Sequence, residues 1–116
     1  MALLILIVQY KSMRLFVSYT LRDGEITPMQ LRRLSRILKA EGHTVFIDYL
    51  DNDSTEKQLR VINELLHCDK IMLLQTRMVK DSEWVALELA YARLYHKQVI
   101  PCRISNNTLI RYNEYA

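Results

Sequence analysis

Short apolar segments alternate with segments of helical periodicity along most of this chain, and that alternation limits the possible folds more than any other feature. The apolar segments are rich in β-branched and aromatic residues, which favours strands. Strands that alternate with helices are typical of a parallel sheet covered by helices on both faces, so we expect an α/β fold. Pro101 predicts that the last strand ends there or lies at an edge. The predicted strands are residues 13–19, 43–49, 70–74 and 98–102.

Helix signals separate the first three strands. Thr27 and Pro28 suit an N-cap and a first helical position, Gln30 completes a capping box, and Gly42 is a stop signal. The apolar stripe of this helix consists of Leu31, Leu34 and Leu38. Residues 53–56 repeat the spacing of a capping box, which predicts a second helix beginning there. Its apolar stripe is Leu59, Ile62 and Leu66.

Composition narrows the class of protein. The chain has 116 residues, enough for one domain with one core, and its net charge of +3 is too small to argue for nucleic-acid binding. Cys68 and Cys102 have no metal-ligand spacing, so we expect two reduced thiols, no metal and a cytoplasmic protein. The apolar residues 2–8 are far shorter than the roughly 20 residues of a membrane helix. We expect an extra strand or extension there, no signal peptide and no membrane.

Glu88 is the residue that most needs an explanation. Every other residue in 84–92 is Trp, Tyr, Val, Ala or Leu, so we expect this helix to lie mostly buried. A buried ionised carboxylate costs several kcal/mol unless it is paired, so Glu88 requires a buried partner or an opening into a cleft. A cleft would make it a functional group, with the Trp84 ring one turn away on the same helix face. A structural partner would be Arg22, Arg77 or Arg103.

Polar residues follow the predicted strands. Ligands of parallel α/β sheets bind beyond the carboxyl ends of the strands, where this sequence places Tyr19, Thr20 and Asp48. Asp48 either holds a ribose or base there or caps the following turn. Asp81 and Ser82 precede the helix of Glu88, and their position favours an N-cap at one of them over a nucleophile.

Three segments resemble motifs of TIR domains, in the same order and spacing. FVSY at residues 16–19 resembles the first-strand motif F-[IV]-S-Y, and VFID at 45–48 resembles the second strand. Residues 82–88 resemble the motif S-x-W-[VC]-x-x-E of the third helix. This resemblance covers most of the chain and implies a flavodoxin-like parallel sheet with helices on both faces.

The resemblance also implies a function. Many bacterial TIR domains cleave NAD at the nicotinamide–ribose bond, with the glutamate of this motif as the catalytic residue, which corresponds to Glu88. It implies that Tyr19, Thr20 and Arg22 line the cleft, and Asp48 and Trp84 complete the candidate substrate-binding set. NAD is then a substrate rather than a bound cofactor. Partners would be further copies of the chain or other TIR domains, in bacterial defence or signalling.

Two departures from the family leave alternatives open. The loop at residues 49–54 is short and lacks glycine, and the chain ends near the family's fifth strand and last helix. We divide the chain into an apolar extension or extra strand at 1–12, a TIR-like domain at 13–105 and a tail at 106–116. The tail or residues 2–8 are the candidates to fill a sheet edge. One alternative is a non-enzymatic TIR interaction module in which Glu88 anchors its helix. The other is an enzyme similar to nucleoside 2-deoxyribosyltransferases, which also use a glutamate.

Overall fold

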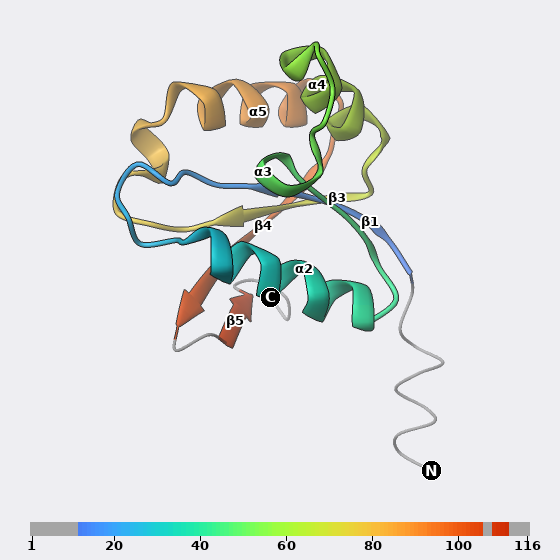
Figure 1. Cartoon of the computed structure of the whole chain (residues 1–116). Coiled ribbons are helices and arrows are strands. Elements are labelled where there is room, and N and C mark those ends of the chain that lie inside the picture. Colours follow the sequence, from blue (N-terminus) through green and yellow to red (C-terminus); the bar gives the residue numbers. More distant parts are fainter. Residues whose placement is uncertain (1–11, 106–107, 112–116) are drawn as a thin grey trace.

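A single mixed sheet organises the computed structural model, which describes residues 12–105 and 108–111 (Figure 1). The strand order is β2-β1-β3-β4-β5, with the first four strands parallel and β5 antiparallel to β4. The strands are β1 (Arg14–Ser18), β2 (Thr44–Ile47), β3 (Lys70–Leu74), β4 (Gln98–Ser105) and β5 (Thr108–Arg111). The parallel α/β fold predicted from the alternation is confirmed. The apolar residues 2–8 lie outside the described residues.

Helices cover both faces of the sheet, as expected (Figure 1). Helix α2 lies on one face, α4 and α5 lie on the other, and the short α3 follows the end of β2. The helices are α2 (Pro28–Ala40), α3 (Asp48–Asp51), α4 (Lys57–His67) and α5 (Glu83–Leu94), with a 3₁₀ turn η1 (Val79–Asp81) before α5. Because the first four strands are parallel, the carboxyl ends of β1, β2 and β3 lie at one edge of the sheet, and the loop from β3 leads from there into α5.

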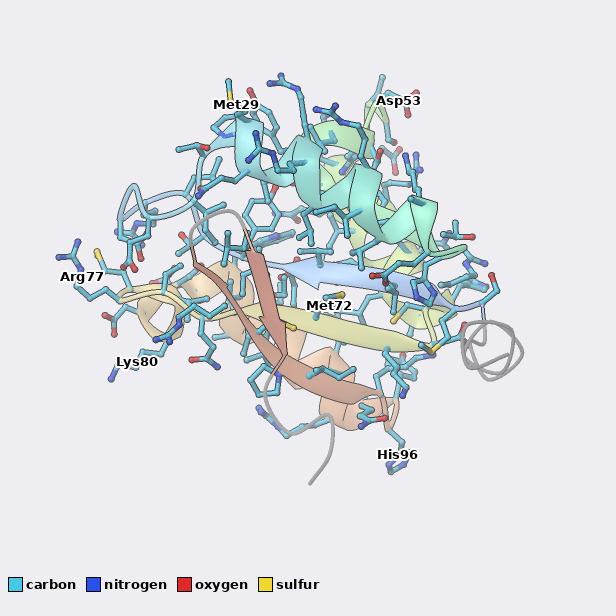
Figure 2. All side chains as sticks on the ribbon, turned by 90° about the horizontal axis from the view of Figure 1, so that it is seen from below. Met29, Asp53, Met72, Arg77, Lys80 and His96 are labelled. Atoms are coloured by element: carbon cyan, nitrogen blue, oxygen red, sulfur yellow. The ribbon has the colours of Figure 1, made fainter. Side chains whose placement is uncertain are left out.

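Strand alternation divides the core between the two faces. Leu15 and Val17 point toward α2, whereas Phe16 lies in the cluster that packs under α4 and α5. Figure 2 shows Met72 inside the α2 side of the core and Met29 on the outer surface of α2; Met72 is 2% exposed and Met29 67%.

The local signals of α2 are all present. The Thr27 hydroxyl accepts a hydrogen bond from the Gln30 backbone N–H at 3.2 Å, and the Gln30 side chain accepts one from the Thr27 N–H at 2.8 Å. Pro28 is the first helical residue, and Gly42 follows the helix with φ +94°, a left-handed conformation that favours glycine. The buried stripe contains the three predicted leucines.

The predicted start of α4 is wrong, and its predicted stripe is only partly right, because Ile62 and Leu66 are half-buried whereas Leu59 is exposed. The helix begins at Lys57, and Ser54 forms a local turn instead, accepting a hydrogen bond from the Glu56 N–H at 3.0 Å. The side chains that face the core are Val61 and Leu65, whereas Leu59 is 63% exposed. Val61 and Leu65 each lie one residue before the predicted Ile62 and Leu66, which corresponds to a rotation of about 100° around the helix. The helix takes this orientation because Val61 and Leu65 pack against the Phe16 and Phe46 rings beneath it.

The carboxyl-terminal strand departs from the prediction. β4 continues beyond Cys102 to Ser105 and turns into β5, which lies within the segment that we described as a tail. The Gln75 N–H donates a hydrogen bond to the Cys102 carbonyl at 2.7 Å, so the backbone polar groups of Cys102 point toward β3. Those of the preceding residue, Pro101, therefore point away from β3, toward the β5 side. The described pairing with β5 runs from Cys102 to Ser105, and Pro101, whose nitrogen carries no hydrogen, lies just before it.

Helix α5 is less buried than its composition predicts. Only Val85, Glu88 and Ala92 are buried, whereas Leu87 is 42% exposed and Leu94 65%. The sheet covers one side of the helix, and no described element covers the opposite side (Figure 1).

The corrected phase of α4 is testable by alanine substitution. We expect Leu65→Ala to lower the free energy of unfolding by about 2–5 kcal/mol, because it empties a fully buried site. Leu59→Ala should change it by less than about 0.5 kcal/mol. Urea unfolding of the two variants measures both values, and equal losses would contradict this orientation of α4.

Candidate functional site

The Glu88 carboxyl group is buried at the carboxyl end of β1. Its residue is 5% exposed, and its Oε1 accepts a hydrogen bond from the Ser18 hydroxyl at 2.7 Å. Ser18 is fully buried as the last residue of β1, where strand alternation points it toward α5, as it does Phe16. A neutral hydroxyl therefore satisfies this carboxyl group.

The start of α5 determines where Glu88 points. The Ser82 hydroxyl accepts a hydrogen bond from the Val85 N–H at 3.2 Å, so Ser82, one of the two residues predicted for this role, is the N-cap. This cap fixes the first turn and places the half-buried Trp84 one turn before Glu88, against the aromatic cluster.

Burial raises the pKa of Glu88 from its ordinary value of 4.5 to about 7. The hydrogen bond from Ser18 opposes this rise, the negative charge of Asp48 adds to it, and a hydrogen bond from the Trp84 side chain opposes it again. The group is thus close to half ionised near neutral pH. Such a value is common among functional acids and bases, although structural groups also show it.

Tyr19 follows Ser18 in the chain, and its side chain lies on the α2 side of the sheet, where it has a positioning contact of its own. Its ring packs against the core on the α2 side, and its hydroxyl oxygen accepts a hydrogen bond from the Tyr49 N–H at 2.9 Å. Burial raises the pKa of Tyr19 to about 12, and the charges of Asp48 and Glu88 contribute. The phenol therefore stays neutral and can donate its proton to an acceptor.

Asp48 has features of both roles that the sequence left open. Strand β2 ends at Ile47, one residue before it, so Asp48 is the first residue of α3. Its Oδ1 accepts a hydrogen bond from the Asn52 side chain at 2.6 Å, which stabilises the turn. Its negative charge also contributes to the raised pKa values of Glu88 and Tyr19.

Thr20 and Arg22, which we expected to line the cleft, form a hydrogen bond with each other. Thr20 is 5% exposed, and its hydroxyl oxygen accepts a hydrogen bond from the Arg22 N–H at 3.3 Å. The Arg22 side chain is exposed. Neither contacts Glu88 through any hydrogen bond or ion pair observed in the described part of the chain.

The arginine pairing proposed for a structural Glu88 is also not observed with Arg22 or Arg77 in residues 12–105. Arg77 lies with its Nε 3.7 Å from a Glu25 carboxylate oxygen. Sequence reasoning missed the actual partner, Ser18. A polar residue ending an otherwise apolar strand, at the position facing the helix of Glu88, was the available signal.

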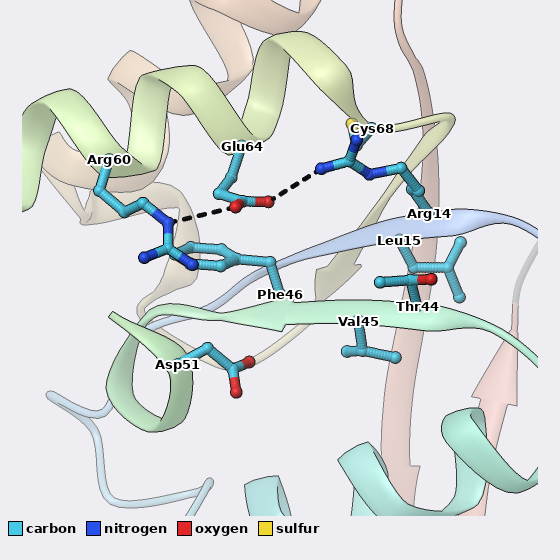
Figure 3. Close-up of a pocket in the computed structure, with 9 residues that line it drawn as sticks. All are labelled: Arg14, Leu15, Thr44, Val45, Phe46, Asp51, Arg60, Glu64 and Cys68. Atoms are coloured by element: carbon cyan, nitrogen blue, oxygen red, sulfur yellow. Dashed lines mark hydrogen bonds and ion pairs between the residues drawn. The ribbon is translucent and has the colours of Figure 1, made fainter. Parts of the chain in front are cut away.

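A separate pocket of about 310 Å³ lies between α4 and the edge of β2 (Figure 3). Glu64 links Arg60 at 3.1 Å to Arg14 at 3.4 Å, and the Arg60 guanidinium lies 5.3 Å from the centre of the Phe46 ring. With the Asp51 carboxylate, which also lines the pocket, the two positive and two negative charges balance. Burial raises the pKa of the lining thiol Cys68 to about 11, which makes it a poor nucleophile. We therefore place the candidate site at Glu88.

Metal and membrane features are not found in the described part of the chain. No group of three or more His, Cys, Asp or Glu side chains there is arranged to hold a metal ion. No helix there is long and apolar enough to cross a membrane. Scans of the chain against protein-family models and against curated protein sequences return no match.

The raised pKa of Glu88 predicts a pH dependence of stability. The folded protein retains the proton up to about pH 7, whereas the unfolded chain releases it near 4.5, so stability falls as pH rises between these values. The slope approaches about 1.4 kcal/mol per pH unit. We expect Glu88→Gln, which has no ionisable group at this position, to show a smaller fall in urea unfolding between pH 5 and pH 8. Parallel curves for the two proteins would contradict a raised pKa.

Proposed function

We propose that this chain cleaves NAD at the nicotinamide–ribose bond, with Glu88 as the catalytic residue, as the TIR resemblance implies. The observation that carries the proposal is a buried carboxyl group whose hydrogen-bond partner is the Ser18 hydroxyl. A carboxylate held by an arginine would already be neutralised, whereas this one keeps its charge available for a cation that develops beside it.

The reaction suits a single carboxylate. Nicotinamide leaves NAD as a neutral molecule, taking the bonding electron pair, so the departing group needs no proton. The ribose carbon becomes oxocarbenium-like, and a negative charge in a site of low dielectric stabilises that transition state. Water then attacks the carbon and loses a proton, giving ADP-ribose. Most glycosidases need two carboxyl groups because their leaving groups must be protonated.

The neighbouring residues fit supporting roles. The Trp84 ring is half-buried next to Glu88 and offers a surface for stacking the nicotinamide or ribose. The Asp48 carboxylate can accept a ribose hydroxyl, and the neutral Tyr19 phenol can donate to an oxygen of the substrate. Thr20 and Arg22 support the loop after β1. We propose bacterial defence or signalling as the setting, with activity favoured by self-association, as in the resembled family.

A second function is supported by the same hydrogen bond. The contact between Ser18 and Glu88 also joins α5 to β1, so the pair would serve equally in a non-enzymatic interaction module. In that case Glu88→Ala would unfold or loosen the domain without removing any turnover.

Nicotinamide release from NAD by the concentrated protein tests the proposal. We expect Glu88→Gln to lower the rate by at least about 100-fold while the variant still folds, because the developing positive charge loses its counter-charge. Glu56→Gln, at an exposed residue that makes no side-chain cap, should retain full activity. If the unmodified protein releases no nicotinamide even at high concentration, the interaction module is favoured. Release of a nucleobase from a deoxynucleoside would favour the transferase-like reaction.

The pH profile gives an independent check. Only the ionised Glu88 stabilises an oxocarbenium ion, and its pKa is about 7. We therefore expect kcat/KM to rise about tenfold per pH unit below 7 and to level off above it. A profile that is flat from pH 5 to pH 8 would show that another group is responsible for the reaction.

A further inference from the structure

The outward side of α5 has a pattern suited to another helix. Glu83, Leu87, Ala90 and Leu94 are all exposed, and they follow one another at intervals of four, three and four residues. This is the spacing of an a/d seam, which places all four on one stripe of the helix surface. We call these four residues the α5 stripe. Its largest members, Leu87 and Leu94, are 42% and 65% exposed.

The stripe lies opposite the side that faces the sheet. Val85, Glu88 and Ala92 are the buried residues of α5, and at about 100° per residue they lie on the side of the helix opposite the stripe. The exposure of the stripe is therefore independent of the site at Glu88. Ala86 and Ala90 are small and exposed, which permits a second backbone to approach closely.

Charge identifies the occupant that fits. Glu83 lies at the amino end of the helix and Arg93 near the carboxyl end, and both are exposed. If a second copy of α5 packs antiparallel across a two-fold axis, each Glu83 approaches the other copy's Arg93. The same arrangement brings each Leu87 against the second copy's Ala90, so that large and small side chains alternate. The stripe is thus complementary to itself in that orientation.

We propose that α5 forms a two-fold, antiparallel contact with α5 of a second copy of this chain. One helix face buries less than the roughly 1,200 Å² typical of stable complexes, so the dimer is weak and depends on concentration. The contact stands whether or not Glu88 cleaves NAD, because it involves the opposite side of the helix.

Sedimentation equilibrium of the full chain over a range of concentrations tests the contact. We expect a monomer–dimer equilibrium, and Leu87→Glu should weaken it by at least about tenfold, since it buries a charge at the centre of the seam. Met29→Glu is the matched control, because Met29 is 67% exposed on the outer surface of α2 (Figure 2), and it should leave the dimer unchanged.

A charge exchange identifies the orientation and does not depend on the apolar variant folding. Glu83→Lys and Arg93→Glu should each weaken the dimer by about three- to tenfold, because each places like charges together. The double variant E83K/R93E should restore it. A protein that stays monomeric up to millimolar concentration, a dimer insensitive to Leu87→Glu, or a double variant no better than the single ones would each overturn the proposal.

Discussion

The hydrogen bond between the Ser18 hydroxyl and the Glu88 carboxyl group, 2.7 Å long, is the contact on which the rest of the candidate site depends. It joins the last residue of β1 to the middle of α5, two elements far apart in sequence. The position of Glu88 follows from the Ser82 cap, and that of Ser18 follows from the alternation of β1. The partner is a neutral hydroxyl, and burial raises the pKa of Glu88 to about 7.

Tyr19 connects the end of β1 to the turn that follows the neighbouring strand β2. Tyr19 reaches across to α3, where its hydroxyl oxygen accepts the Tyr49 N–H, and so holds that turn against the end of β1. Asp48, the first residue of α3, is thereby kept near Glu88 while Asn52 occupies one of its oxygens. The carboxyl end of the sheet thus carries the buried carboxyl group of Glu88, the partly exposed carboxyl group of Asp48 and the neutral phenol of Tyr19. Under the proposed function, this set would hold a polar ligand with a positively charged reacting group.

Much of the fold follows from local sequence signals. The capping box at Thr27 and Gln30 and the glycine after the helix are local patterns, and the structure contains them as predicted. The phase of α4 was not predictable in the same way, because Leu59, Ile62 and Leu66 form as good an apolar stripe as Val61 and Leu65. Only the position of the Phe16 and Phe46 rings beneath the helix decides between them. The pairing of β5 likewise depends on tertiary contacts with β4.

The candidate site also combines a feature that the local sequence predicts with one that depends on tertiary contacts. Glu88 was identified from its chemical environment along the helix, but its partner was sought among the arginines because only charge was considered. Ser18 required knowledge of which face β1 presents to α5. The expectation that α5 is buried all round also failed, since composition alone does not say how many sides of a helix the sheet covers.

Direct titration of Glu88 tests the central claim that this carboxyl group is buried against the Ser18 hydroxyl and has a raised pKa. In a ¹³C NMR titration of glutamate-labelled protein, the signal that disappears in Glu88→Gln belongs to this residue. We predict a midpoint of about 7 for that signal. A midpoint near the ordinary value of 4.5 would show that Glu88 is solvated or paired, and would contradict both the described burial and the role that we assign to it.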